Sequence, residues 1–341
     1  MRNYLNKISL AAFAILATAS FESCKQRDDW PKFDKKPVVI KDESVAVDTD
    51  KSWYVTTLEQ KNNTVLKRFL ADTVYNLADG ITYGKIQFYD NLDQIQLVHV
   101  VEGDLNNPNV GVVSLVPYGV QLPNLQTVSG MATDNEGIGG KIMAAINGDN
   151  MSSNTTNTYG YPANGFVNYG KVMRSWVYNT TNIARPFIGV KKGSGEVFIG
   201  NTSNNTTFPY TWIDQSELLH QVSGPTWAIY NTWSNTSSTD LIARALIGMN
   251  ESENKVYFIC IEGKRTGIAT GMGLPNFSKI LKDWGINKAF MPYYSQYGQL
   301  AKREENERGK VSFPLVNVPT TSAAAVSTGT LANAVAIVSK K

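Results

Sequence analysis

The chain has 341 residues, with 32 Lys and Arg against 29 Asp and Glu, which gives a formal net charge of +3. No basic run is longer than a pair of residues, so charge attraction to nucleic acid has no support and we expect no nucleic-acid partner. The chain contains only two histidines and two cysteines. This scarcity disfavours zinc sites and thiol enzymes, and Cys260, inside an apolar run, is expected to fill core space.

The N-terminus has the pattern of an export signal. Arg2 and Lys7 precede an uncharged apolar stretch at 8–19, which is shorter than the roughly 20 residues of a membrane-spanning helix. A hydrophobic residue, Phe21, lies three places before Cys24. This spacing resembles a lipobox, in which Cys24 is lipidated and becomes the first mature residue. The alternative is a plain secretory signal cleaved near Ala19.

We therefore divide the chain into a lipoprotein signal peptide at 1–23, a charged tether at 24–45, a helical and strand extension at 46–79 and a domain at 80–338. The polar and acidic residues 26–29 are similar to signals that send some lipoproteins to the outer surface. The expected location is the outer membrane, with a lipid anchor and exposure at the cell surface.

Three segments carry helical periodicity. The first ends near Gly80, the second covers 137–146, and the third follows Pro275, which suits a first helical turn, and stops at Gly285. The apolar positions of the first are Val65, Leu66, Phe69, Leu70, Thr73 and Leu77, and those of the third are Phe277, Ile280, Leu281 and Trp284.

Short apolar or alternating segments predict strands over most of the remaining chain. Segments rich in Asn, Ser and Thr separate them and are expected to be surface loops. We predict an α+β fold with mixed, mostly antiparallel sheets and a few packed helices in a single domain. The predicted strands are 81–89, 95–102, 110–116, 187–190, 197–199, 227–230, 245–249, 256–261, 288–291 and 331–338.

Several short glycine-bearing segments occur in the order found in the phosphodiester glycosidase family, which the chain resembles over about 80–338. They include an asparagine-glycine motif at 145–149, an arginine-bearing strand at 243–248 and an acidic-glycine turn at 262–265. The resemblance implies hydrolysis of an N-acetylglucosamine-like phosphodiester or a related glycan bond, without a cofactor. The other matching segments are 80–83, 98–101, 104–106, 160–165, 170–172, 185–190, 222–225, 271–275 and 332–335.

One segment departs from the family pattern. Where the family has an aspartate followed by three glycines and a serine, this chain reads Met-Pro-Tyr-Tyr-Ser-Gln-Tyr-Gly at 291–298, with Tyr293 in the place of the aspartate. Tyrosine is neutral near pH 7 and is a poor substitute for a carboxylate base. We expect weak or absent hydrolysis, or an altered mechanism, because a tyrosine nucleophile does occur in some glycosidases.

Cleavage of a glycosyl phosphodiester needs carboxyl groups to handle protons and a cation to neutralise phosphate. The candidate catalytic residues are Asp149, Glu262 and Arg244, although Arg244 can instead pair with a carboxylate for structure and the two acids can be solvated turn residues. Asp104 is expected to cap a turn, and His99 to be structural. The candidate substrate-binding residues are Asn147, Ser223, Arg265, Tyr293, Ser295 and Asn333.

Two other functions remain open at this stage. A non-catalytic carbohydrate-binding lipoprotein on the same fold would use the aromatic residues around Tyr293 as a stacking surface. A structural surface protein without a ligand is the third possibility. No metal is assigned, although an oxygen-ligand calcium site in the Asn- and Asp-rich turns is conceivable. The expected ligand is a glycan or a glycosyl phosphate.

Overall fold

The computed structural model describes residues 51–341, apart from 121–123, 151–159, 176–184, 203–207, 209–210, 212, 294–297, 321–325 and 327–328. These described residues belong to one compact unit, Val47–Lys341. The predicted signal peptide, Cys24 and the tether lie outside them. No helix among the described residues is long and apolar enough to cross a membrane.

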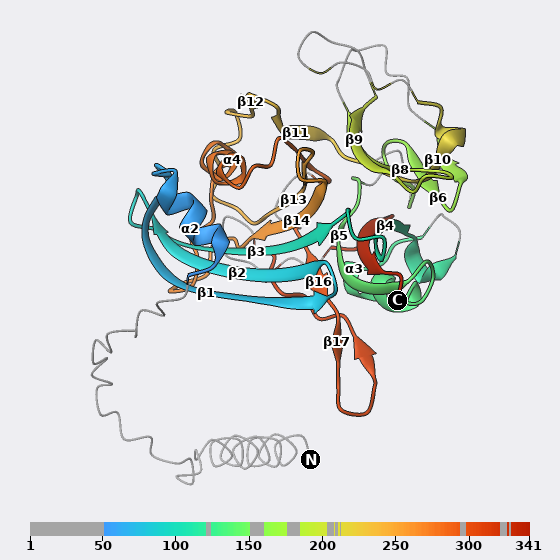
Figure 1. Ribbon diagram of the computed structural model, residues 1–341, viewed down its shortest axis with the longest axis horizontal. Coiled ribbons are helices and arrows are strands. Elements are labelled where there is room, and N and C mark those ends of the chain that lie inside the picture. Colours follow the sequence, from blue (N-terminus) through green and yellow to red (C-terminus); the bar gives the residue numbers. More distant parts are fainter. Residues whose placement is uncertain are drawn as a thin grey trace, which may run out of the picture. The chain divides into compact units, whose positions relative to one another are not determined.

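Antiparallel sheets dominate the fold, as predicted, and the described residues form three α-helices that pack on them (Figure 1). The helices are α2 (Trp53–Gln60), α3 (Val128–Asp134) and α4 (Leu274–Asp283), and short 3-10 turns cover Pro117–Gly119 and Gln215–Glu217.

An eight-stranded sheet has the order β1-β2-β3-β14-β13-β15-β11-β12. Its strands are β1 (Leu66–Ala78), β2 (Ile81–Asp90), β3 (Ile95–Asp104), β11 (Thr226–Tyr230), β12 (Trp233–Ser234), β13 (Arg244–Asn250), β14 (Lys255–Ile261) and β15 (Lys288–Met291).

The smaller sheets have four, five and two strands. The first contains β16 (Leu300–Lys302), β5 (Lys141–Asn147), β19 (Ala334–Ser339) and β4 (Val110–Leu115); the second contains β7 (Lys171–Arg174), β6 (Phe166–Asn168), β10 (Leu218–Ser223), β8 (Pro186–Lys191) and β9 (Val197–Asn201); the third is the hairpin of β17 (Glu304–Glu305) and β18 (Val311–Ser312).

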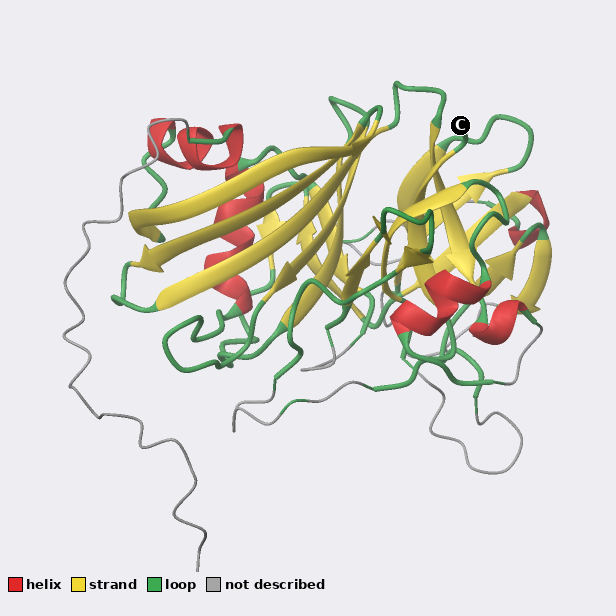
Figure 2. Cartoon of the chain, turned by 90° about the horizontal axis from the view of Figure 1, so that it is seen from below, coloured by secondary structure: helices red, strands yellow, loops and turns green. Residues whose placement is uncertain are grey.

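The central strands β14, β13 and β15 of the eight-stranded sheet are buried on both faces. One face packs against α2 and α4, where the indole of Trp284 donates a 2.9 Å hydrogen bond to the carbonyl of Tyr54. The other face contributes Val101, Ala245 and Phe258 to a core shared with the four- and five-stranded sheets. Figure 2 shows the curved sheet and the helices beside it. The two faces of β14 therefore contact different parts of the molecule. A residue at the end of β14 points either toward the helices or toward the core between the sheets, depending on its face.

Helix α4 confirms the prediction for this segment. Its proline lies in the first turn, where the missing N–H costs little. Gly285 follows with φ of +79°, a conformation that glycine adopts readily at a helix end. The apolar stripe including Phe277, Ile280 and Leu281 packs into the helix-side core.

The helix predicted before Gly80 is wrong, because Leu66–Ala78 form strand β1. This strand pairs with β2 along its length, but its register shifts at three places. Each shift resets the alternation of apolar and polar residues. The apolar residues consequently recur at a spacing that resembles a helix.

The helix predicted at 137–146 is also wrong. Gly137, Gly139 and Gly140 have positive φ and form a turn, and strand β5 follows. Met143 and Ile146 pack in the inter-sheet core, while Ile142 and Ala145 pack against α3 on the other face. A strand buried on both faces is continuously apolar, so periodicity cannot distinguish it from a buried helix.

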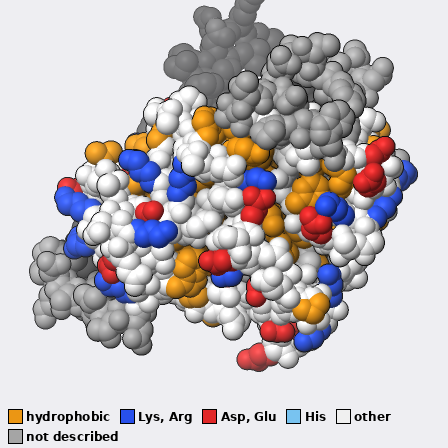
Figure 3. Space-filling model, turned by 45° about the horizontal axis from the view of Figure 1, so that its top comes forward, with side chains coloured by type: hydrophobic (Ala, Val, Ile, Leu, Met, Phe, Trp, Pro, Cys, Tyr) orange, Lys and Arg blue, Asp and Glu red, His pale blue; other side chains and the backbone are white. Residues whose placement is uncertain are grey.

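On the face shown in Figure 3, basic and acidic side chains are interspersed with hydrophobic ones. Exposed ion pairs such as Lys67–Asp93 and Lys191–Glu196 have this mixed character. This surface pattern agrees with the near-neutral composition of the chain.

Candidate functional site

Two groups of polar residues surround buried carboxyl groups that follow strand ends, because Asp149 comes after β5 and Glu262 directly after β14. We call Asn147, Asp149, Asn164 and Asn333 the aspartate group. Strand β5 ends at Asn147 and antiparallel β19 starts at Ala334, its pairing partner. Asp149 and Asn333, just outside these two strands, are thereby brought together although 184 positions separate them in the chain.

Asn333 holds the turn that carries Asp149. Its side-chain oxygen accepts a 2.8 Å hydrogen bond from the backbone N–H of Asp149, and its carbonyl accepts one of 3.1 Å from Gly148 N–H. A Cβ at position 148 would lie only 2.0 Å from Asn333 Oδ1. Glycine is therefore required here by the close approach of Asn333.

The carboxyl group of Asp149 is fully buried and is hydrogen-bonded by Asn164. The backbone N–H of Asn164 lies 2.6 Å from Oδ2, and its amide nitrogen lies 2.9 Å from Oδ1. Burial raises the pKa of Asp149 to about 7, and the Asn164 hydrogen bonds and the charge of Arg185 offset only part of this effect. A carboxyl group of this kind can give or take a proton near neutral pH.

The same group contains a buried donor without a partner. Asn333 is fully buried, and its Nδ2 makes no hydrogen bond to any described residue. Leaving a buried amide N–H unpaired costs about 1–3 kcal/mol. Such a donor is a candidate contact for a ligand oxygen.

Ser223 supports the aspartate group indirectly. Its hydroxyl donates a 2.8 Å hydrogen bond to the carbonyl of Gly165, which directly follows Asn164. The Ser223 oxygen also accepts a hydrogen bond from Gln221. Ser223, predicted to bind substrate, therefore supports the backbone next to Asn164.

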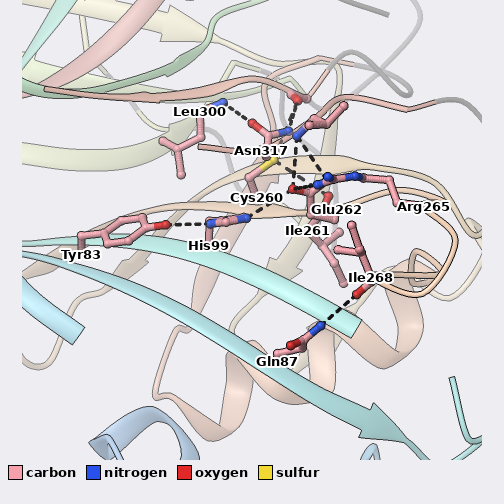
Figure 4. Close-up of polar contacts among 12 residues, drawn as sticks. Tyr83, Gln87, His99, Cys260, Ile261, Glu262, Arg265, Ile268, Leu300 and Asn317 are labelled. Atoms are coloured by element: carbon pink, nitrogen blue, oxygen red, sulfur yellow. Dashed lines mark hydrogen bonds and ion pairs between the residues drawn. The ribbon is translucent and has the colours of Figure 1, made fainter. Parts of the chain in front are cut away.

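The second group, which we call the glutamate group, consists of Tyr83, His99, Glu262 and Arg265 (Figure 4). Tyr83 is on β2, His99 is on β3 opposite Cys260 of β14, and Glu262 comes directly after β14. All three side chains point to the face that carries the inter-sheet core. Tyr83 hydroxyl lies 2.8 Å from His99 Nδ1, and His99 Nε2 lies 3.4 Å from Glu262 Oε1.

Glu262 is surrounded by donors. Arg265 Nη1 lies 3.1 Å from its Oε1, and the backbone N–H of Val318 lies 3.2 Å from both carboxylate oxygens. Burial, followed by the charge of Glu262, raises the pKa of the neighbouring Cys260 thiol well above its ordinary value. A thiol with a raised pKa is a poor nucleophile, so Cys260 serves as a core residue.

A short segment before β16 connects the two groups. Asn147 accepts a hydrogen bond from Gln299 N–H, and the carbonyl of the preceding Gly298 accepts one from Asn317 at 2.7 Å. Cys260 Sγ also lies 3.8 Å from the Gly298 carbonyl oxygen. Gln299 thus contacts the aspartate group, and Gly298 contacts Cys260 and Asn317, which are neighbours of Glu262 and Val318 in the chain or in the fold.

Arg244 does not join either group. It pairs with Ile261 across β13 and β14, so its side chain points to the helix side of the sheet, opposite to Glu262. Its guanidinium donates to the carbonyls of Met272 at 3.1 Å and Asp240 at 2.8 Å. This placement corrects the expectation that Arg244 faces the carboxyl groups. The side chain instead stabilises the loops that contain Asp240 and Met272.

The segment that departs from the family pattern is described only in part. Tyr293 is half-buried and packs against the core between the four-stranded sheet and α3. Ser295 lies outside the described residues. A stacking surface built around Tyr293 therefore receives no support from its position.

Three partners of the carboxyl groups were not assigned a role from the sequence. Asn164 and Arg185 lie in segments that matched the family, but nothing in their spacing linked them to Asp149. Val318 contributes only its backbone N–H, which no sequence pattern reveals. Among the described residues no three His, Cys, Asp or Glu side chains gather as metal ligands would.

Comparisons with solved structures show the fold. The zebrafish N-acetylglucosamine-1-phosphodiester alpha-N-acetylglucosaminidase catalytic domain, in a form auto-inhibited by its pro-peptide, matches with a TM-score of 0.50 at 16% identity, over 79% of this chain and 88% of that domain. A Burkholderia pseudomallei protein matches with a TM-score of 0.53 at 9% identity, over 80% of this chain and 98% of the other.

A Synechocystis protein matches with a TM-score of 0.50 at 12% identity, and the match spans 79% of this chain but 64% of that protein. Neither the protein-family models nor the curated protein sequences gave a match. The chain therefore has a fold related to that of the zebrafish catalytic domain.

Proposed function

We propose that this protein hydrolyses a glycosyl phosphodiester, of an N-acetylglucosamine-like sugar, or a related glycan bond at the aspartate and glutamate groups. The observation that carries the proposal is Asp149, a fully buried carboxyl group that is hydrogen-bonded by Asn164 and whose pKa burial raises to about 7, with a smaller opposing effect from the charge of Arg185. The related fold of the zebrafish phosphodiester glycosidase domain supports the same reaction class.

Each residue has a defined part in this proposal. Asp149 transfers a proton at the scissile bond, since its pKa lies near the operating pH. Arg185 takes the phosphate-neutralising part first expected of Arg244, because a guanidinium can bind two phosphate oxygens. Asn333 Nδ2 donates to a sugar or phosphate oxygen. Glu262 is the second carboxyl group, held by Arg265 and Val318.

The reaction is tested with the purified protein and N-acetylglucosamine 1-(methyl phosphate), beside a panel of p-nitrophenyl glycosides. Asp149→Asn should lower kcat/KM by about a hundredfold or more, because the proton transfer is lost. Asp90→Asn is the matched control: Asp90 is also buried, but its carboxylate accepts from Leu92 and Gln94 in its own turn.

Equal turnover by wild type and Asp149→Asn would refute the assignment of Asp149. Absence of turnover, together with saturable binding of the same diester, would identify a carbohydrate-binding protein instead. The side-chain amide of Asn333, which has no hydrogen-bond partner among the described residues, favours that second function, because an oxygen ligand can accept from it without any bond being broken.

The proposal includes a lipid anchor at Cys24 and exposure at the surface of the outer membrane. The support is the apolar segment at 8–19 followed by Cys24. Cys24→Ala should move the protein from the membrane fraction to the soluble fraction and abolish incorporation of labelled palmitate. A variant that still sediments with membranes would contradict the anchor.

A further inference from the structure

His99 lies between a tyrosine and a carboxylate that come from the strands on its two sides. Its Nδ1 is 2.8 Å from the Tyr83 hydroxyl, within hydrogen-bond range, and its Nε2 is 3.4 Å from Glu262 Oε1, slightly beyond that range. His99 is 2% exposed, and Nε2 makes no hydrogen bond to any described residue. The carboxylate is the group that this buried nitrogen faces.

The chemistry of these two neighbours permits two hydrogen-bond arrangements, and each is completed when Nε2 and Glu262 Oε1 approach closer than their separation of 3.4 Å. When Glu262 is ionised, the tyrosine O–H donates to Nδ1, and Nε2–H donates to the carboxylate. When Glu262 is protonated, its O–H donates to Nε2. Nδ1–H then donates to the tyrosine oxygen, and the tyrosine O–H no longer points toward His99. The second arrangement holds one proton more, on Glu262, and the imidazole remains neutral with its proton on the other nitrogen.

We propose that Tyr83 and His99 are a pair of positioning residues that holds Glu262 in place in both of its protonation states. The hydrogen bonds of this pair reverse their direction when Glu262 gains or loses a proton. The catalytic meaning of this pair rests on the proposed function of Glu262. A carboxyl group that alternates between acid and base needs partners that accept from one form and donate to the other. Arg265 and Val318 can only donate, so the imidazole is the partner that can do both.

The titratable groups around this pair come from several elements. Cys260 of β14 and Arg265 face Glu262, while Tyr75 of β1 and Lys302 of β16 lie against the ring of Tyr83. Burial, with smaller contributions from Tyr75 and Glu262, raises the pKa of Tyr83 well above its ordinary value. The tyrosine thus remains protonated and can serve as a donor.

Imidazole nitrogen NMR tests the pair without requiring any activity. The chain has only two histidines, so His220→Gln assigns both spin systems in a sample labelled with ¹⁵N-histidine. At pH 8 we expect His99 in the Nε2–H form, because an ionised Glu262 requires a donor. Tyr83→Phe should shift the Nδ1 resonance and leave the Nε2–H form in place. An Nδ1–H form, or an imidazolium that persists at pH 8, would overturn the proposal.

Kinetics then separate positioning from a purely structural role. Tyr83→Phe should lower kcat about tenfold with KM unchanged and displace one limb of the kcat–pH profile. The control is Tyr257→Phe, which removes a buried hydroxyl on the opposite face of the same sheet. A Tyr83→Phe variant that loses stability but keeps the wild-type kcat and pH profile would overturn the proposal. If the wild type hydrolyses no substrate, the proposed function fails, and the NMR result still decides whether the pair exists.

Discussion

Asp149 and Glu262 are both buried carboxyl groups just beyond strand ends, but their partners differ. Asp149 receives its hydrogen bonds from the neutral amides of Asn164. Glu262 receives a direct hydrogen bond from the charged Arg265 and another from a backbone N–H. Neutral donors offset only part of the cost of burying a carboxylate, and the pKa of Asp149 is raised to about 7. The hydrogen bonds that Asn164 donates to Asp149 therefore come from uncharged groups, whereas one of the donors to Glu262 is a guanidinium.

The largest expected effect is a pH dependence of stability caused by Asp149. Its proton is held more tightly in the folded state, with a pKa of about 7 against an ordinary value of 3.8. The associated stability is fully present below about pH 4 and is lost as the pH rises to about 7, by up to about 4 kcal/mol. Urea denaturation at intervals from pH 4 to pH 8 measures this loss.

Asp149→Asn should remove most of that dependence, since asparagine does not titrate. The slope of unfolding free energy against pH is the relevant quantity, because the new amide also disturbs the Asn164 hydrogen bonds. If the stability of the variant falls as steeply between pH 4 and pH 7 as that of the wild type, another titratable group causes the effect.

Glu262→Gln gives the next largest effect and tests the other side of the comparison. It removes the charge that pairs with Arg265 but keeps the shape of the side chain, so we expect a loss of about 1–3 kcal/mol in unfolding free energy. This loss should be measurable by urea denaturation at pH 8. The stability decrease between pH 4 and pH 7 should persist in this variant, and its disappearance would contradict the assignment of that decrease to Asp149.

Arg265→Lys should have the smallest effect. The Arg265 side chain is 30% exposed, and lysine retains a positive charge that can reach Glu262, so a change below about 1 kcal/mol is expected. Thermal unfolding of the variant beside the wild type measures it. A larger loss would mean that the position and shape of the guanidinium, and not its charge alone, hold Glu262.

Local sequence patterns determined the elements in which several local signals agree. Helix α4 has one apolar stripe, a proline in its first turn and a glycine after its end, and all three signals agree. Strand β14 combines short length with β-branched and aromatic residues. The class of the fold, with antiparallel sheets and few helices, followed from such segments.

Tertiary structure alone decided the remaining features. The bulged edge strand β1 and the doubly buried strand β5 both lose the alternation that identifies a strand, because pairing irregularities or a second covered face override it. The direction of the Arg244 side chain follows from its register opposite Ile261, which places it away from Glu262. Asn333 meets Asp149 only because β19 returns beside β5. Residue type and position pointed to both acidic residues, but only the fold brings Val318 and His99, which are distant in the chain, to Glu262.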